Sequence, residues 1–401
     1  MFKNKNFNLL FFATFFNSFG DAILFVILLS MLQQIGGGSV SISLYFLLSA
    51  LPVLLFGLHI GAYIEKKLLK TVMLTSSTLR ISLLLLCYIY FLYADYSTVF
   101  IFLVIFIITF IHLFFANASG AMLPQIVAPI HIPKANSLFR VVTMTGKLIA
   151  YSFAALLFHF NLTVPEMLLL LILFYVGAIT SIFLMRVPSH NTSQPAQNLR
   201  LLDAIKEGLT YIRRDKMLSR LFIIFGLGWM VGSAIDLYLI SYLKLVVGKG
   251  AENLFIFTTP TMIGILIGSF ISPILYNKWD KKLGLCLSLF AFSFAILCFA
   301  LQLPLLVLQA LLIVGGVSQG ILNIFVVSIL QTTVPTQFIA RVFSVYNIIC
   351  IGGGIPGYLV FGYLIDQIGV ISLGFILSTY LLIVGIICIK YLPNLGMKIE
   401  N

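Results

Sequence analysis

The sequence predicts an all-α membrane protein with twelve transmembrane helices arranged as two six-helix bundles. Hydrophobic residues make up 61% of the 401 residues, and charged residues only 9%, against about 25% in an average soluble domain. The apolar residues fall into twelve runs, and a membrane-spanning helix needs about 20 of them. One long hydrophilic segment divides the runs into six and six. This composition excludes a soluble enzyme, a disordered chain and a nucleic-acid-binding protein.

Each apolar run is long enough to cross a bilayer, and the run ends are accurate to a few residues. The first, 7–32, is too long for a signal peptide and lacks a convincing small-residue cleavage site. The twelve runs are 7–32, 42–64, 71–93, 98–122, 138–159, 166–185, 219–246, 254–276, 283–301, 304–330, 342–365 and 371–391.

The hydrophilic segment between the sixth and seventh runs predicts a linker that carries a surface helix. It opens with a Ser, Asn, Gln and Pro stretch over 189–198 and continues with apolar residues at helical spacing from Leu201 to Ile212. The predicted organisation is therefore an N-terminal bundle (1–185), a cytoplasmic linker with an amphipathic helix (186–218) and a C-terminal bundle (219–401).

The cations predict the topology of the chain. There are 24 Lys and Arg against 12 Asp and Glu, a formal net charge of +12. If the N-terminus is cytoplasmic and the runs alternate sides, 20 of the 24 cations lie on the cytoplasmic side, and only Lys244 and Lys249 lie outside. The positive-inside rule then places both termini in the cytoplasm. The basic surplus thus indicates orientation in a membrane and no nucleic-acid partner.

An internal repeat relates the two halves. Ser18-x-x-Asp21 recurs 215 positions later as Ser233-x-x-Asp236, and Glu65 recurs at the same offset as Asp280. Because six spans separate the two copies, both have the same orientation in the membrane. This pattern predicts two bundles related by a pseudo-two-fold axis normal to the bilayer.

Four charged residues fall well inside the apolar runs: Asp21, Arg80, Lys147 and Asp236. A charge at the bilayer centre costs about 2.5–3.5 kcal/mol, so such residues usually serve a function. They and nearby polar residues on the same helix faces predict a water-filled central path that binds substrate or protons. The other residues predicted to line this path are Asn17, His112, Trp229, Ser233, Gln319 and Asn323.

Each of these residues has an alternative interpretation. Asp21 and Lys147 could form a pair that only holds helices together, and Arg80 could extend toward the cytoplasmic surface. His112 is either a second proton carrier or a hydrogen-bonding partner of a neighbouring helix. No cysteine or histidine spacing suits a metal ion.

The loop after the second run predicts a gate. Gly61 permits close helix packing, and the acid Glu65 precedes the cations Lys66 and Lys67, so the loop can form a charge-assisted contact that breaks and reforms. Asp280 stands in the matching loop of the second half. An ordinary cytoplasmic basic loop is the alternative.

At this loop the chain resembles the major facilitator superfamily, whose pattern is Gly, three residues, Asp and then basic residues. Gly61, Glu65, Lys66, Lys67 and Lys70 match it, with Glu in place of Asp. The resemblance covers essentially the whole chain in length, span number, linker and repeat.

Within that superfamily the chain looks most like the macrolide-efflux and siderophore-exporter branch of bacterial drug:proton antiporters. Asn17 to Asp21, and 334–344 with the gating candidate Arg341, carry this resemblance. Two features depart from it. The fourth run holds His112 and no Arg, and the Gly/Pro cluster lies in the eleventh run instead of the fifth.

The resemblance implies a secondary transporter that exports a small amphipathic compound, such as a drug, a siderophore-like molecule or a metabolite, by alternating access and proton antiport. We expect no cofactor besides a proton gradient, no enzymatic activity, and a multi-pass monomer in the bacterial inner (cytoplasmic) membrane whose partners are its substrate and the bilayer. The alternatives are a lysophospholipid or lipid flippase, a small-metabolite importer, and a membrane receptor that does not transport.

Overall fold

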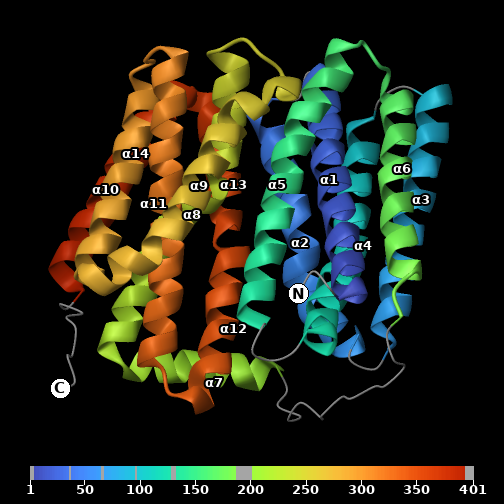
Figure 1. Ribbon diagram of the computed structural model, residues 1–401. Helices are drawn as coiled ribbons and strands as arrows, with labels where there is room; N and C mark the ends of the chain where they lie inside the picture. The colour runs from blue at the N-terminus through green and yellow to red at the C-terminus, as the bar shows by residue number, and fades with distance from the viewer. Residues whose placement is uncertain are drawn as a thin grey trace. The chain divides into compact units, whose positions relative to one another are not determined.

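The computed structural model describes residues 4–35, 38–64, 67–94, 97–127, 132–186 and 201–392. Within these ranges every regular element is helical, and no strand occurs. Twelve segments of the described chain are long and apolar enough to cross a membrane. The all-α prediction is therefore confirmed, and the chain is a multi-pass membrane protein (Figure 1).

Two compact units make up the chain, and each is described by itself. Unit 1 covers Met1–Gln197 together with Lys249–Phe255. Its elements, blue to green in Figure 1 apart from the yellow 3₁₀ turn η2, are α1 (Lys5–Gln34), α2 (Ser39–Ile64), α3 (Leu69–Tyr93), α4 (Thr98–Ile126), α5 (Ile132–His159), α6 (Val164–Phe183) and η2 (Ala251–Asn253).

Helix α1 forms the centre of unit 1 and packs against α4, α5 and α6. One apolar core gathers around residues 19–32 of α1, and a second gathers around Phe7, Leu10 and Ala13. Asn17 lies on α1 between these two stretches. The turn η2 also belongs to this unit, because the Ala251 amide donates to Gln33 Oε1 of α1 at 2.9 Å.

Unit 2 covers Asn198–Gly248 and Ile256–Asn401. Its helices, yellow-green to red in Figure 1, are α7 (Leu201–Arg214), α8 (Lys216–Leu245), α9 (Phe255–Lys278), α10 (Lys281–Ala300), α11 (Leu305–Thr333), α12 (Thr336–Gly352), α13 (Gly354–Ile368) and α14 (Val370–Tyr391).

The eleventh predicted span is broken in the structure. It divides at Gly353 into α12 and α13, whereas the sequence pattern predicts one helix over 342–365. The break follows from composition, since Pro356 has no amide hydrogen to donate to the carbonyl of Gly352. At Gly353 an added Cβ would lie 2.5 Å from the Ile349 carbonyl oxygen.

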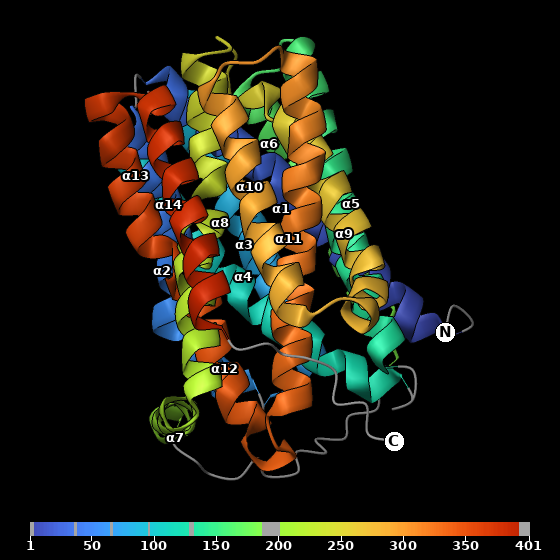
Figure 2. The same ribbon diagram turned by 90° about the vertical axis from the view of Figure 1, so that its left-hand side faces the viewer.

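The amphipathic helix predicted within the linker is α7 (Leu201–Arg214), and it runs across the long helices of unit 2. Figure 2 shows it nearly end-on. The Tyr211 ring stacks on Phe338 of α12 with centroids 4.6 Å apart. Asp215 separates α7 from α8. Its carboxylate accepts from the Met217 and Leu218 amides and so caps the start of α8. The Ser, Asn, Gln and Pro stretch lies outside the described residues.

Helices α9 and α11 approach each other backbone to backbone. A Cβ added to Gly264 would lie 2.2 Å from the Ile313 carbonyl oxygen, and one added to Gly316 would lie 2.2 Å from that of Thr261. Gly268 and Gly320 repeat the contact one turn further along. Small residues four positions apart are the usual means of bringing membrane helices this close.

Candidate functional site

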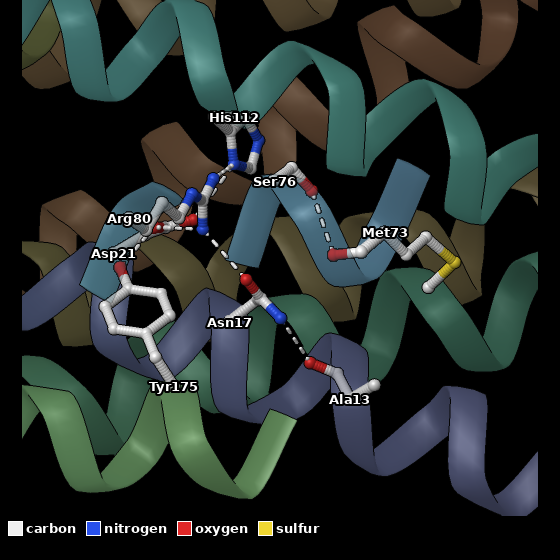
Figure 3. Close-up of polar contacts among 8 residues, drawn as sticks. All are labelled: Ala13, Asn17, Asp21, Met73, Ser76, Arg80, His112 and Tyr175. Atoms are coloured by element: carbon white, nitrogen blue, oxygen red, sulfur yellow. Dashed lines mark hydrogen bonds and ion pairs between the residues drawn. The ribbon is translucent and has the colours of Figure 1, made fainter. Parts of the chain in front are cut away.

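A charged cluster lies inside unit 1, where four helices meet (Figure 3). Asn17 and Asp21 are one turn apart on α1 and therefore point the same way. Arg80 of α3 is fully buried, and its Nη1 donates to Asn17 Oδ1 at 2.8 Å and to Asp21 Oδ1 at 3.0 Å. A buried arginine requires such a counter-charge, because an unpaired ion in an apolar interior costs several kcal/mol.

Asn17 is oriented by its own helix. Its Nδ2 donates to the Ala13 carbonyl oxygen at 2.9 Å, which leaves Oδ1 to face Arg80. The amide therefore offers the guanidinium an acceptor that carries no charge. Arg80 Nε has no hydrogen-bond partner among the described atoms, so the guanidinium keeps one donor unused.

His112 of α4 completes the cluster on its open side. Its Nδ1 lies 3.1 Å from Asp21 Oδ2 and also contacts Arg80 Nη2. The imidazole side chain is 42% exposed and that of Asp21 25%, while Arg80 is inaccessible. Water or a bound molecule can therefore reach the acid and the imidazole, but not the guanidinium.

The position of His112 Nδ1 makes its protonation state decisive. A guanidinium only donates hydrogen bonds, and an ionised carboxylate only accepts them. With a lone pair on Nδ1, His112 can accept from Arg80. With a proton on Nδ1, it can donate to Asp21. One nitrogen thus contacts two partners, one of which requires Nδ1 without a proton and the other Nδ1 with a proton.

Tyr175 of α6 is a member of the cluster that the sequence analysis did not identify. Its hydroxyl donates to Asp21 Oδ1 at 2.6 Å, and its ring centroid lies 5.4 Å from the Arg80 guanidinium carbon. Gly20 makes room for this ring, since a Cβ there would lie 3.0 Å from Tyr175 Cζ. Gly20, next to Asp21, was the only sequence signal that a large side chain packs there. Glycines are common in membrane helices, so this signal was not specific.

The cation that pairs with Asp21 differs from the expected one. Lys147 forms no ion pair with Asp21 among the described residues; Arg80 occupies that role. The expectation of an Asp21–Lys147 pair is therefore wrong. The alternative in which Arg80 extends to the membrane surface is also wrong, because Arg80 is 0% exposed and points toward α1.

In unit 2, three of the predicted polar residues gather where α8, α11 and α12 meet. The Trp229 indole donates to the Cys350 carbonyl oxygen at 2.9 Å, and Asn323 Nδ2 donates to the Tyr346 hydroxyl at 3.1 Å. Gln319 Nε2 donates to the Gly232 carbonyl oxygen at 3.4 Å and borders two cavities of about 20 Å³ each. Such a volume can hold about one water molecule.

Asp236, the repeat partner of Asp21, has different surroundings. Its side chain is exposed and lies near Tyr358 of α13. The residue 215 positions after Arg80 is Ala295, so unit 2 lacks the matching arginine. Ser233 lies in α8, and its side chain is outside the described ones. The repeat therefore preserves the acid of the cluster but not its arginine.

The predicted gating residues are only partly described. Gly61 lies in the last turn of α2, and Glu65 and Lys66 fall outside the described residues. Lys67 lies over the Tyr63 ring, 5.5 Å from its centroid. Asp280 caps α10 by accepting from the Lys282 amide at 2.9 Å.

Arg341, the remaining gating candidate, lies in α12. Its backbone is described, and its side chain is outside the described ones.

Comparison with known proteins gives one family. Residues 10–357 match the Major Facilitator Superfamily, which is most of the chain. No curated protein sequence matches the chain.

Several solved transporter structures share the fold. A mutant of the nucleoside transporter NupG superposes with a TM-score of 0.80 at 15% identity, covering 97% of this chain and 100% of that one. A bacterial homologue of the iron transporter ferroportin, in an inward-facing state, gives 0.73 at 15% identity, with 97% and 99% covered. A variant of the E. coli fucose:proton symporter FucP gives 0.60 at 17%, with 95% and 97% covered.

Proposed function

Because the chain belongs to the Major Facilitator Superfamily, we propose that it is a secondary active transporter that exports a small amphipathic compound in exchange for protons. The observation that carries the proton coupling is the place of His112 Nδ1 between Asp21 and Arg80. Histidine is the side chain whose ordinary charge change falls between pH 5 and 8. Export would follow from alternating access, in which the two units reorient around the substrate.

In the proposed cycle, a proton arriving from the exposed side binds His112 Nδ1. The imidazolium then donates to Asp21 Oδ2, and Arg80 Nη2 loses its acceptor. The imidazolium thereby occupies Asp21 Oδ2, an accessible acceptor that a donor group of the substrate would otherwise bind. Loss of the proton restores the contact between His112 and Arg80 and leaves Asp21 Oδ2 open to the substrate, so substrate and proton compete for one cluster.

The remaining polar residues have supporting roles in this proposal. Trp229, Ser233, Asp236, Gln319 and Asn323 would contact the substrate from unit 2. Lys147, on α5 and only partly exposed, would bind an anionic group of the substrate.

The cytoplasmic loops would form the gate of the transporter. Gly61, Glu65, Lys66, Lys67, Asp280 and Arg341 would hold the cytoplasmic side closed. We place the chain as a monomer in a bacterial cytoplasmic membrane, with both termini inside.

The first experiment identifies a substrate. The purified protein is melted with candidate drugs, siderophores, nucleosides, sugars and amines, because a compound that binds the native state raises its melting temperature. The best compound is then followed in proteoliposomes under an imposed pH gradient.

The proton role is tested with Asp21→Asn and His112→Gln. Both should abolish transport driven by the gradient, whereas His159→Gln, an exposed histidine at the end of α5, should transport as the natural protein does. Gradient-driven transport that persists in both cluster variants would contradict proton coupling through this site. Binding without translocation by the natural chain would favour the receptor alternative.

Import is the second candidate, and the name of one structural relative favours it, because a fucose:proton symporter moves its substrate in the same direction as the proton. The two directions of coupling predict opposite signs in one measurement. When substrate is added outside vesicles that hold a pH-sensitive dye, a symporter acidifies the interior and an antiporter makes it more alkaline.

Lipid flipping is the remaining alternative. It predicts movement of a labelled lysophospholipid that is independent of the pH gradient. The same vesicles can therefore test it beside the compound found by melting.

A further inference from the structure

A groove opens at the surface of unit 1 between α3 and α4, close to the end of α2. It encloses about 520 Å³. Leu68, Thr75 and Leu79 line it from α3 and the residue before it, and Phe110 and Phe114 line it from α4. Tyr63 and Lys67 border the end at which α3 begins. The charged cluster around Asp21 contributes no lining residue, so this is a separate feature.

The walls of the groove offer an occupant mainly apolar contacts. The hydroxyls of Thr75 and Ser76 donate to the Val72 and Met73 carbonyl oxygens of their own helix, at 3.1 and 3.0 Å. Leu68 and Leu79 are about half exposed beside them. In a bilayer these leucines lie against hydrocarbon, so an acyl chain along them meets matching apolar surface. The body of the occupant is therefore apolar.

The length of the groove fits one hydrocarbon chain. Leu79 of α3 is eleven residues after Leu68, the residue before the helix, which at 1.5 Å per residue is about 16 Å. The hydrocarbon of a single membrane leaflet is about 15 Å thick, half of a typical 30 Å core. An acyl chain lying along α3 would therefore run from the leaflet surface to about its midplane.

The cation Lys67 lies at one end of this apolar path. Lys70, three residues further on, is already engaged, because its Nζ donates to the Phe183 and Met185 carbonyl oxygens at the end of α6. The described contact of Lys67 is with the face of the Tyr63 ring. Its ammonium donors thus have no oxygen partner among the described residues and can bind an anion.

We propose that this groove binds one anionic phospholipid, with the phosphate at Lys67 and one acyl chain along α3 toward Leu79. In the proposed topology this end faces the cytoplasm, where anionic lipids attract basic residues by about 1 kcal/mol each. The groove reaches Ser76, one turn before Arg80, and Ile111, the residue before His112. A bound chain would therefore brace the two helices that carry the base and the cation of the cluster.

The headgroup preference tests the proposal without any transport assay. A tryptophan is placed in the groove by Phe114→Trp, in a chain whose two natural tryptophans, Trp229 and Trp279, are replaced by Phe. The protein is reconstituted in phosphatidylcholine vesicles that contain either brominated phosphatidylglycerol or brominated phosphatidylcholine, and quenching is titrated. The anionic lipid should quench at about five-fold lower concentration, which corresponds to 1 kcal/mol.

Lys67→Gln should abolish that preference, and Lys278→Gln, which removes an exposed cation at the end of α9, should leave it intact. Equal quenching by the two lipids overturns the proposal and leaves ordinary contact with surrounding lipid. A preference that survives Lys67→Gln overturns it as well, because the phosphate then binds elsewhere.

A second measurement is made in the chain that keeps both natural tryptophans, and it needs no fluorescent reporter. Native mass spectrometry counts phosphatidylglycerol molecules retained by the detergent-solubilised protein. Leu79→Trp fills the groove and should remove one retained lipid. Leu86→Trp changes another exposed leucine on the same face of α3, outside the groove, and should retain it. Equal retention by the two variants contradicts the proposal, whatever the outcome for proton antiport.

Discussion

At the residue scale, the chemistry of unit 1 depends on one guanidinium that is shared by several partners. Arg80 contacts an amide, a carboxylate and an imidazole, and the Phe115 and Tyr175 rings lie 6.0 and 5.4 Å from its central carbon. Only a planar group with several fixed donors can meet partners in so many directions. The arginine is therefore more than a counter-charge for Asp21.

This geometry predicts that Arg80→Lys is not a conservative change. A lysine ammonium is a compact charge and cannot reach Asn17, Asp21 and His112 together, so at least one buried polar group loses its partner, at about 1–3 kcal/mol. The melting temperature in detergent should fall. Arg220→Lys, at an exposed arginine that donates to the Tyr391 carbonyl oxygen, is the matched control. Equal melting temperatures for both variants would contradict the shared-donor arrangement.

The same residues show how far sequence reasoning reaches. Asn17, Asp21, Arg80 and His112 can all be selected from the sequence, because polar groups in apolar runs are few. Their mutual contacts cannot, since spacing fixes a residue's face on its own helix but not the rotation of that helix against its neighbours. For this reason Lys147 was expected beside Asp21, and Tyr175 was missed.

At the element scale, unit 2 is held together by helices that touch through their backbones. The two glycine pairs of α9 and α11 leave no space for even one methyl group. Interiors packed this closely respond to added volume with shifts of whole elements.

We therefore expect Gly316→Ala to destabilise unit 2, although alanine is the better helix former. Forcing a methyl against the Thr261 carbonyl should cost at least about 1–3 kcal/mol. Gly120→Ala in α4 is the control: nothing lies within 4 Å of its added Cβ, and the helix should gain up to about 1 kcal/mol. Thermal unfolding of both variants in one detergent tests this. A stable Gly316→Ala protein would mean that α9 and α11 separate without penalty.

The elements themselves were largely predictable, because the length and hydropathy of a membrane span leave few choices. The break in the eleventh span at Gly353 was not predicted, although its glycines and Pro356 were visible. Glycine and proline are tolerated in membrane helices when neighbours satisfy the backbone, so their presence alone does not locate a break.

At the scale of the whole molecule, the charge distribution predicts how the chain lies in the membrane. Twelve spans would put both ends of the chain on one side, and the positive-inside rule predicts that this side is the cytoplasm. The turn between α10 and α11, at Leu301 to Pro304, should then face outward.

Reporter fusions test this arrangement. A fluorescent protein that matures only in the cytoplasm should be bright when fused after Asn401, and alkaline phosphatase inserted after Gln302 should be active. An inactive phosphatase at Gln302 together with an active one at the C-terminus would reverse the proposed orientation.

The short turn η2 has a consequence for how the protein is made. Unit 1 includes Lys249–Phe255, which are synthesised only after α7 and α8. The first six helices therefore leave the ribosome before Ala251, whose amide donates to the Gln33 side chain near the end of α1, is made. Domains usually fold in the order of synthesis. Unit 1 is completed only after α8 of unit 2 has been made. In nascent chains halted between α6 and η2, the Gln33 side chain would therefore lack its bond to Ala251.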